Sequence, residues 1–221
     1  MGKTAIILGA TGLTGGLLLE QLLIDSRYSK IILFSRTTCN IKHDKIEEHL
    51  VDLLNLTTYK GLFIADEVFC CIGTTKAKTP NEEQYLEIDF GIPVMAAQLC
   101  KENDINTFLV VSALGADKHS TIFYNRTKGR MEEAVFMEKI PNTYILQPSL
   151  IGGNRNEKRL GESIAKVFMK ILNPLLFGSL SKYKSIHPIT IAKSMVILVN
   201  SSHPSGRIVS NKIKKIVKNN D

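Results

Sequence analysis

Residues 5–23 read AIILGATGLTGGLLLEQLL and place an apolar run on each side of a glycine-rich turn. Ala5–Leu8 is apolar without polar alternation, which is typical of a strand buried on both faces in a parallel sheet. Gly16–Leu23 is rich in leucine and also carries Glu20 and Gln21, which favours a helix packed on that sheet. The stretch therefore predicts a strand, a tight turn and a helix, in that order.

The turn between these runs has the features of a phosphate-binding loop. Its glycines are spaced G-x-x-G-x-x-G, and glycine tolerates positive φ and lets the backbone approach a ligand closely. Unpaired amides at a helix start suit a pyrophosphate. A strand–helix corner without a ligand is the alternative, since the usual dinucleotide spacing is G-x-G-x-x-G. Because the turn follows a strand and opens a helix, we interpret it as a dinucleotide site made by Gly9, Thr11, Gly12, Leu13, Thr14 and Gly15.

Composition narrows the class of protein. A chain of 221 residues that is 44% apolar predicts one domain with a large core. No apolar run reaches the roughly 20 residues of a membrane helix, and no secretion signal precedes the first strand. Four cysteines without a C-x-x-C pair, and scattered histidines, indicate a reducing cytoplasm and no metal site.

The net charge of +7 owes much to the last residues, NKIKKIVKNND. A basic cluster of this kind binds nucleic acid or a membrane surface, or is a solvated tail. No aromatic residue is interleaved to stack on bases, so we interpret it as a solvated tail and expect no specific nucleic-acid partner.

Strand-like and helix-like segments alternate up to Pro148, which predicts an α/β fold: a doubly wound parallel sheet with its ligand at the carboxyl ends of the strands. The expected strands are Ala5–Leu8, Ile31–Phe34, Glu48–Val51, Glu67–Cys71, Thr107–Val111 and Thr143–Leu146. The expected helices are Gly15–Leu23, Asn81–Lys101 and about Asn125–Glu138. Later elements are helices at 160–172 and 189–199 and a strand at 206–209. We expect one domain over 1–221, with 151–221 as a small substrate-side lobe and basic tail.

The ends of later strands extend the dinucleotide site. The second strand ends in Ser35 and Arg36, at the point that faces the adenosine ribose in dinucleotide folds. An acidic residue at this point would bind the ribose hydroxyls and repel the 2′-phosphate of NADP(H). A guanidinium can hold that phosphate, so we expect NADP(H) to be preferred over NAD(H), although an ordinary surface arginine is the alternative. Asp52 could accept a bond from adenine or cap the next turn. The remaining cofactor-binding candidates, for the nicotinamide half, are Cys71, Ile72, Gly73, Thr74, Thr75 and Pro148.

A serine, a tyrosine and a lysine form the candidate catalytic group. Ser112 ends the fifth strand, and Tyr124 and Lys128 follow with the spacing Y-x-x-x-K, which puts them on one helical face. An ammonium beside a phenol favours the phenolate, and tyrosine needs that help because it titrates near 10. We expect Tyr124 to exchange the proton during hydride transfer and Ser112 to orient the substrate oxygen.

In order and spacing, GATGLTG, CCIGTTKAK, SALGADKHSTIFYNRTKGRMEE and LQPSLIGGNR resemble an atypical branch of the short-chain dehydrogenase/reductase superfamily, the Tat-interacting-protein-like (oxidoreductase CC3-type) NAD(P)-binding proteins. The resemblance spans residues 5–155. It implies a Rossmann fold, NADP(H) as ligand, and Ser112, Tyr124 and Lys128 as the catalytic trio, with Lys128 also contacting the cofactor. Two positions depart from the pattern: Asp89 lies near the place of an asparagine, and Gln147 replaces an arginine.

Two hypotheses follow. The first is a cytoplasmic NADP(H)-dependent oxidoreductase, a monomer or homodimer, that acts on a small carbonyl or alcohol. The second is a regulator that binds NADP(H) without turnover and contacts a protein partner.

Overall fold

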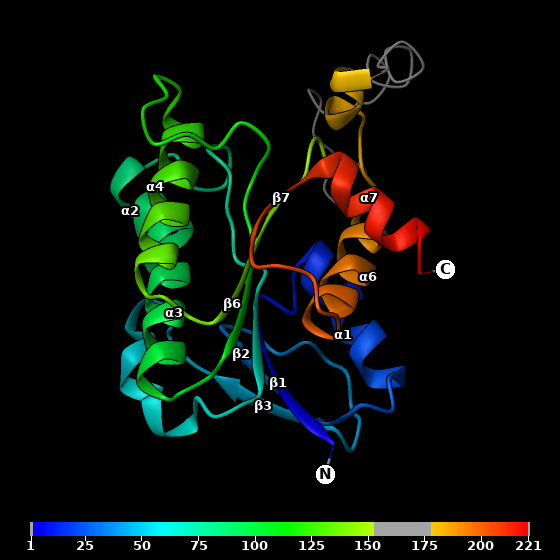
Figure 1. The fold of residues 1–221 in the computed structure, drawn as a ribbon. Coiled ribbons are helices and arrows are strands. Elements are labelled where there is room, and N and C mark those ends of the chain that lie inside the picture. Colours follow the sequence, from blue (N-terminus) through cyan, green and yellow to red (C-terminus); the bar gives the residue numbers. More distant parts are fainter. Residues whose placement is uncertain (1, 153–177, 221) are drawn as a thin grey trace.

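The computed structural model describes residues 2–152 and 178–220, and its centre is a seven-stranded parallel sheet (Figure 1). The strand order is β3-β2-β1-β4-β5-β6-β7, and every neighbouring pair is parallel. The strands are β1 (Lys3–Leu8), β2 (Tyr28–Ser35), β3 (Ile46–Leu50), β4 (Glu67–Cys70), β5 (Thr107–Val111), β6 (Asn142–Gln147) and β7 (Gly206–Val209). This confirms the doubly wound α/β fold.

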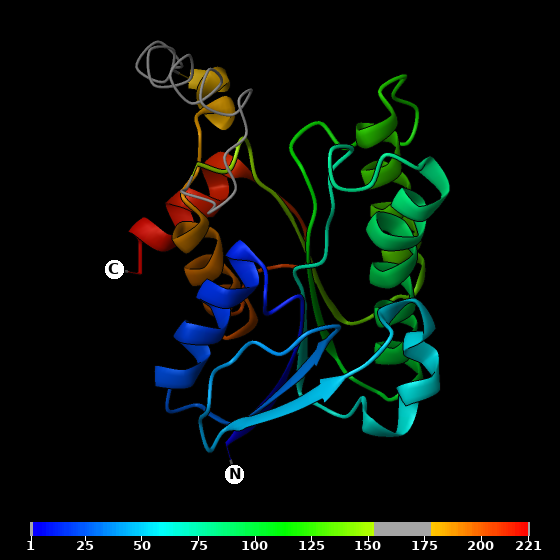
Figure 2. The ribbon, with the colours of Figure 1, turned by 180° about the vertical axis from the view of Figure 1, so that it is seen from behind.

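Helices cover both faces of the sheet, as Figures 1 and 2 show from opposite sides. One face carries α1 (Leu13–Ile24), α6 (Pro188–Val199) and α7 (Ser210–Lys218). The other carries the 3-10 segment η1 (Leu53–Leu62), α2 (Glu82–Leu86), η2 (Glu87–Gly91), α3 (Ile92–Glu102) and α4 (Phe123–Met137). A short 3-10 segment, η4 (Gly178–Tyr183), precedes α6. None of the helices in the described ranges is long and apolar enough to span a membrane.

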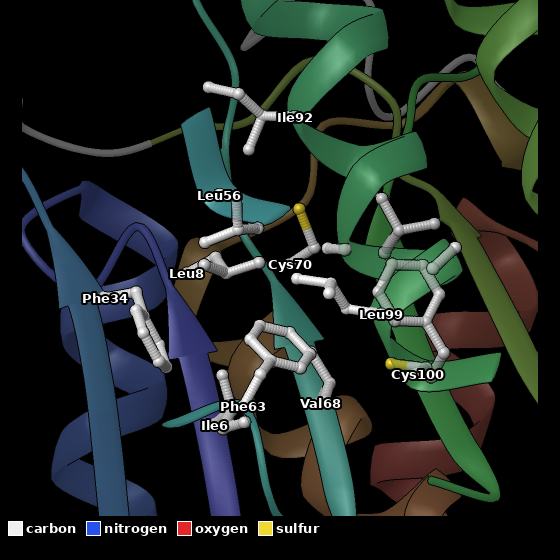
Figure 3. Packing of buried hydrophobic residues seen from close by; sticks show 14 of the residues in the cluster. Ile6, Leu8, Phe34, Leu56, Phe63, Val68, Cys70, Ile92, Leu99 and Cys100 are labelled. Carbon is white, nitrogen blue, oxygen red and sulfur yellow. The ribbon is translucent and has the colours of Figure 1, made fainter. Parts of the chain in front are cut away.

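The first strand contributes to a separate core on each face of the sheet. Ile6 and Leu8 pack with the η1, α3 and α4 side, as Figure 3 shows, while Ala5 and Ile7 pack with α1 and α6. All four side chains are fully buried. Burial on both faces explains why this strand is continuously apolar rather than alternating.

The helix expected over Asn81–Lys101 is instead three consecutive segments, with the π-helical η2 between α2 and α3. Pro93 explains the interruption: it has no amide to donate to the carbonyl of Asp89, four residues earlier, and its ring crowds that carbonyl. The backbone widens there, and Asp89 lies in the widened turn with its side chain fully buried. π-helical turns of this kind are frequent at functional sites.

The C-terminal region forms part of the central sheet and of the helical layer on one of its faces, rather than only a small lobe at the ligand edge. β7 pairs with β6 in the central sheet, and α6 packs beside α1. The lysine-rich tail is the helix α7, in which Ile213 and Val217, four residues apart, are buried while its lysines face outward or lie half-buried. Residues 188–218 thus contribute a strand and two helices to the layers around the central sheet. The helix expected at 160–172 lies outside the described residues.

A partly buried polar cluster closes the amino-terminal edge of the sheet. Lys3 Nζ lies 3.0 Å from Glu67 Oε2 and donates to Asn200 Oδ1 at 2.8 Å. The hydroxyl of Tyr28 donates to Glu67 and accepts from Asn200 Nδ2 at 2.7 Å. Burial raises the pKa of both Glu67 and Tyr28. The cluster joins the starts of β1, β2 and β4 to the end of α6.

A substitution at Gly15 tests how closely α1 must approach the turn. A Cβ at Gly15 would lie 2.1 Å from the carbonyl oxygen of Gly9, whereas a Cβ at Gly61 would meet nothing within 4 Å. We expect Gly15→Ala to lower the free energy of unfolding by about 1–3 kcal/mol, or roughly 3–10 °C in Tm, because α1 must shift away from β1. Gly61→Ala is the control. Equal melting temperatures in calorimetry for the two variants would contradict the close approach.

Candidate active site

The turn after β1 has the geometry of a phosphate-binding loop. Gly9 has φ +88°, a conformation that favours glycine, and its carbonyl accepts a 3.0 Å hydrogen bond from the Gly12 amide. Gly12 is the N-cap of α1, so no side chain caps the first amides of the helix. The first turn, which begins with Leu13 and Thr14, contains no acidic residue. The helix start therefore presents amides and partial positive charge, and its first turn holds no carboxylate that would repel a pyrophosphate.

A cleft of about 270 Å³ lies beside this turn at the carboxyl ends of β1 and β2. Five of the predicted cofactor residues line it: Gly9, Thr11, Ser35, Arg36 and Ile72. Two further lining residues were missed, Thr37 and Leu53. Each comes within three residues of a strand end, which is the signal that could have found them. The lining of the cleft therefore combines the glycine turn after β1 with residues that follow the ends of β2, β3 and β4.

Arg36 and Ser35 take different positions in the cleft. The Arg36 side chain is exposed, and no hydrogen bond or ion pair joins its guanidinium to another described residue. Ser35 is buried, and its hydroxyl donates to the carbonyl of Thr37 at 2.9 Å. The arginine is thus the charged group of the cleft that can meet an anion.

Asp52 caps a helical segment. Its Oδ1 accepts a 3.0 Å bond from the Leu54 amide, and its Oδ2 accepts a 2.7 Å bond from Asn55 Nδ2 at the start of η1. Of the two interpretations considered for Asp52, the structure supports the turn cap. The adjacent Leu53 lines the cleft instead.

The loop after β4 is fastened at several points. The Cys71 amide donates to the Leu8 carbonyl at 2.8 Å, which holds the loop against β1. Further on, the Thr74 amide donates to Asp89 Oδ2 at 2.6 Å, and the carbonyl of Thr75 accepts from the Lys78 amide at 2.9 Å. Gly73 lies beside the charged side chains of Asp89 and Lys128. A Cβ at Gly73 would be 3.6 Å from Asp89 Oδ1 and 3.9 Å from Lys128 Nζ.

Lys128 and Asp89 form a buried ion pair beneath this loop. Lys128 Nζ lies 2.7 Å from Asp89 Oδ1, and the two side chains are 4% and 1% exposed. Burial alone would lower the pKa of Lys128, but the charges of Asp89 and Tyr124 outweigh it and raise that pKa.

Tyr124 lies one turn before Lys128 on α4, is 40% exposed, and interacts electrostatically with Lys128. Its neighbour Phe123 fixes the start of the helix. The Phe123 ring packs edge-on against Tyr85, with centroids 5.3 Å apart, and Lys76 Nζ lies 4.5 Å from its centroid. Tyr124 is therefore presented to solvent at the carboxyl edge while Lys128 lies beneath it.

Ser112, which was expected to orient the substrate oxygen, contacts α4 one helical turn beyond Lys128. It is buried, and its hydroxyl donates to Glu132 Oε1 at 2.5 Å. Gln147 Nε2 donates to the same carboxylate at 2.9 Å, and Arg207 Nε on β7 at 2.6 Å. Ser112 and Gln147 are thus parts of a buried polar network that supports α4. Glu132 was missed, although its position four residues after Lys128 places it on the same helical face.

The last predicted cofactor residue, Pro148, is buried after β6. Its carbonyl accepts a 2.9 Å bond from the Leu114 amide, which joins the chain ends of β5 and β6. Pro148 thus shapes the edge of the sheet beside the turn that follows Ser112.

These features define a dinucleotide-binding protein of the Rossmann type, with a tyrosine and a lysine beside its ligand edge. Residues 5–128 match the NAD dependent epimerase/dehydratase family, and the chain belongs to this family. Protein HTATIP2 of Rattus norvegicus is 31% identical over 182 residues, which cover 80% of this chain and 72% of the relative. The mitochondrial protein FMP52 of Lodderomyces elongisporus is 32% identical over 196 residues, 81% of this chain and 80% of the relative.

Solved structures share the fold at low sequence identity. The UDP-Glc/GlcNAc 4-epimerase of Campylobacter jejuni superposes with a TM-score of 0.69 at 15% identity, covering 99% of this chain and 83% of the epimerase. The UDP-N-acetylglucosamine 4-epimerase of Methanobrevibacter ruminantium gives a TM-score of 0.71 at 16% identity, with 99% and 82% covered. They confirm the Rossmann-type architecture.

The expected cytoplasmic location is contradicted. Relatives from Lodderomyces elongisporus, Scheffersomyces stipitis and Debaryomyces hansenii are named mitochondrial proteins. The four cysteines are free, but free thiols occur in more than one reducing compartment. Cysteine usage was therefore too coarse a criterion for location.

Two adjacent glutamates test the network behind α4. Glu132 is 1% exposed and accepts bonds from three side chains, whereas Glu133 is 38% exposed on its side chain and pairs with Arg207 and Lys118 at the surface. We expect Glu132→Gln to lower the free energy of unfolding by about 1–3 kcal/mol, because a buried amide cannot satisfy all three donors. Glu133→Gln is the control and should cost clearly less in urea denaturation. A loss no larger than that of the control would show that the network contributes little.

Proposed function

We propose that the protein is an NADP(H)-dependent oxidoreductase that transfers a hydride to or from a small carbonyl or alcohol, with Tyr124 as proton donor or acceptor. The observation that carries this proposal is that the partly exposed Tyr124 lies one helical turn before the buried Lys128 on α4 and interacts with it electrostatically. Family membership supports a nicotinamide cofactor.

The residues that would hold the cofactor follow the strand ends. The turn from Gly9 to Gly12 and the first turn of α1 suit the pyrophosphate, because a helix start offers amides and partial positive charge and no acidic residue lies in that first turn. Arg36 suits a 2′-phosphate on the adenosine ribose, since a guanidinium binds phosphate oxygens through two parallel hydrogen bonds. The loop Gly73–Thr75 suits the other half, which when bound gives or takes the hydride.

Tyr124 and Lys128 of α4 would then transfer the proton that accompanies the hydride. In the direction of reduction, the Tyr124 hydroxyl gives its proton to the substrate oxygen as that oxygen becomes an alcohol. The Lys128 ammonium stabilises the phenolate left behind, which lets a group that normally titrates near 10 act closer to neutral pH. In the direction of oxidation, the same phenolate accepts the proton.

Arg36 is expected to set the preference between cofactors. Arg36→Ala should weaken NADPH binding by about 10–100-fold, the value of a charge-assisted hydrogen bond, and leave NADH binding nearly unchanged. Arg36→Lys retains the charge but not the two-point geometry, so it should give an intermediate loss. Calorimetric titrations with both cofactors measure this. Equal losses for NADPH and NADH would assign Arg36 to the general shape of the cleft.

Tyr124→Phe tests the proton role. We expect kcat for NADPH-dependent reduction across a panel of carbonyl compounds to fall by about 10²–10⁴-fold, while NADPH affinity is retained, because only the hydroxyl is removed. Tyr59→Phe, which removes a hydroxyl from η1, is the control and should retain activity. Unchanged turnover in Tyr124→Phe would assign the proton to another group.

The second candidate, an NADP(H)-binding regulator without turnover, is favoured by one observation. The Ser112 hydroxyl is committed to Glu132 and is buried, so it is poorly placed to orient a substrate oxygen. For this candidate, wild-type protein would bind NADPH and oxidise none of it with any carbonyl. A protein partner would then have to be recovered differently with and without NADPH.

A further inference from the structure

We propose that Asp89 is the positioning residue of this site: its carboxylate keeps the buried Lys128 ammonium charged and fastens it to the loop Gly73–Thr75. The inference rests on the proposed function only for the use made of Lys128. The charge state of Lys128 is a property of the protein without cofactor or substrate, so it can be measured separately.

The Asp89 carboxylate divides its two oxygens between the loop and the helix. Oδ2 accepts the Thr74 amide at 2.6 Å, and Oδ1 contacts Lys128 Nζ at 2.7 Å. The side chain therefore bridges the chain segment that would meet the nicotinamide half and the lysine that would act on Tyr124. A displacement of either segment would have to break one of these contacts.

Gly73 and the π-helical turn allow this arrangement. The Cα of Gly73 passes over the ion pair, and a side chain there would extend towards Asp89 Oδ1 and Lys128 Nζ. From the other side, the widened turn of η2 brings Asp89 inward, so that the residue is fully buried. Backbone on both sides thus excludes water from the pair.

Exclusion of water makes a counter-charge necessary. An unpaired lysine in such a place would lose its proton, since desolvation lowers the pKa of buried lysines by up to 3–5 units. The titratable groups around Lys128 are Asp89 on η2, Tyr124 on α4 and Cys70 on β4, and Tyr85 on α2 faces Asp89 and Tyr124. Burial raises the pKa of Cys70 to about 11 and raises that of Tyr85, so both are neutral near pH 7. Of these described groups, Asp89 is the carboxyl group, and its Oδ1 lies 2.7 Å from the ammonium.

Substitution of Asp89 by asparagine separates its charge from its shape. The amide of the new side chain retains an oxygen for the Thr74 amide, and its NH2 group replaces the oxygen that faces Lys128, so the negative charge and the acceptor beside the ammonium are removed together. We expect Asp89→Asn to lower the pKa of Lys128 by about 2 units or more, so that the amine becomes neutral as pH rises through a value well below that of the wild type. The measurement is a pH titration by NMR of protein labelled with 13C at lysine Cε, with the Lys128 signal assigned by its absence in Lys128→Met.

Glu87→Gln is the matched control, since it removes the same charge from the exposed surface of η2. It should leave the Lys128 titration unchanged. A Lys128 that titrates alike in Asp89→Asn and wild type would overturn the proposal, whether or not the protein turns over any substrate. Absence of turnover with an altered Lys128 titration would instead count against the proposed function alone.

A double variant covers the case in which Asp89→Asn folds poorly. Removal of both partners of a buried ion pair costs less than removal of one, because no isolated charge remains. We therefore expect Asp89→Asn with Lys128→Met to unfold at a higher urea concentration than Asp89→Asn alone. A double variant no more stable than the single one would show that Lys128 does not depend on the carboxylate, and would overturn the proposal.

Discussion

The close contact between the Gly9 carbonyl and Gly15 is the constraint on which the rest of the structure depends. With no side chain at Gly15, α1 can begin directly against the end of β1, where a Cβ would come within 2.1 Å of that oxygen. The approach brings the helix amides to the sheet edge and lets α1 cover β1 with α6 beside it. The cleft, the loop after β4 and α4 are all arranged around this edge. The absence of a side chain at Gly15 thus allows both the packing of α1 on β1 and the position of the helix amides at the sheet edge.

The face of α4 that points towards the site changes from exposed to buried along its length. Tyr124, Lys128 and Glu132 follow at intervals of four residues, the first partly exposed and the other two buried. Each buried charge has a partner from a distant segment: Asp89 of η2 for the lysine, and Arg207 of β7 for the glutamate. Two ion pairs of opposite polarity therefore hold α4, one at Lys128 and the other one turn further along at Glu132.

The sequence was sufficient for the fold and for the glycine turn because both depend on local patterns. Apolar runs, glycine spacing and the alternation of strands and helices place the ends of β1, β4, β5 and β6 to within two residues and those of β2 to within three. What it did not determine depends on contacts between distant segments. The Ser112 hydroxyl bonds to Glu132, which Arg207 holds from β7, and neither partner can be read from the residues around Ser112. Asp52 likewise accepts a bond from the Leu54 amide and so caps the segment that follows it. The π-helical turn at Asp89 has a local cause in Pro93, but its consequence, the contact with Lys128, is again distant in sequence.

The polar cluster at the amino-terminal edge has a consequence for how the chain reaches its folded state. Lys3 and Tyr28 bond to Asn200, which lies 197 and 172 residues further along the chain. On the ribosome, these bonds of the first two strands cannot form until Asn200 has been synthesised. Contacts of such long range slow folding and prolong the exposure of apolar strands. Nascent chains that end before α6 should therefore present an unfinished sheet to chaperones, and the end of α6 marks the point of synthesis at which the amino-terminal edge can close.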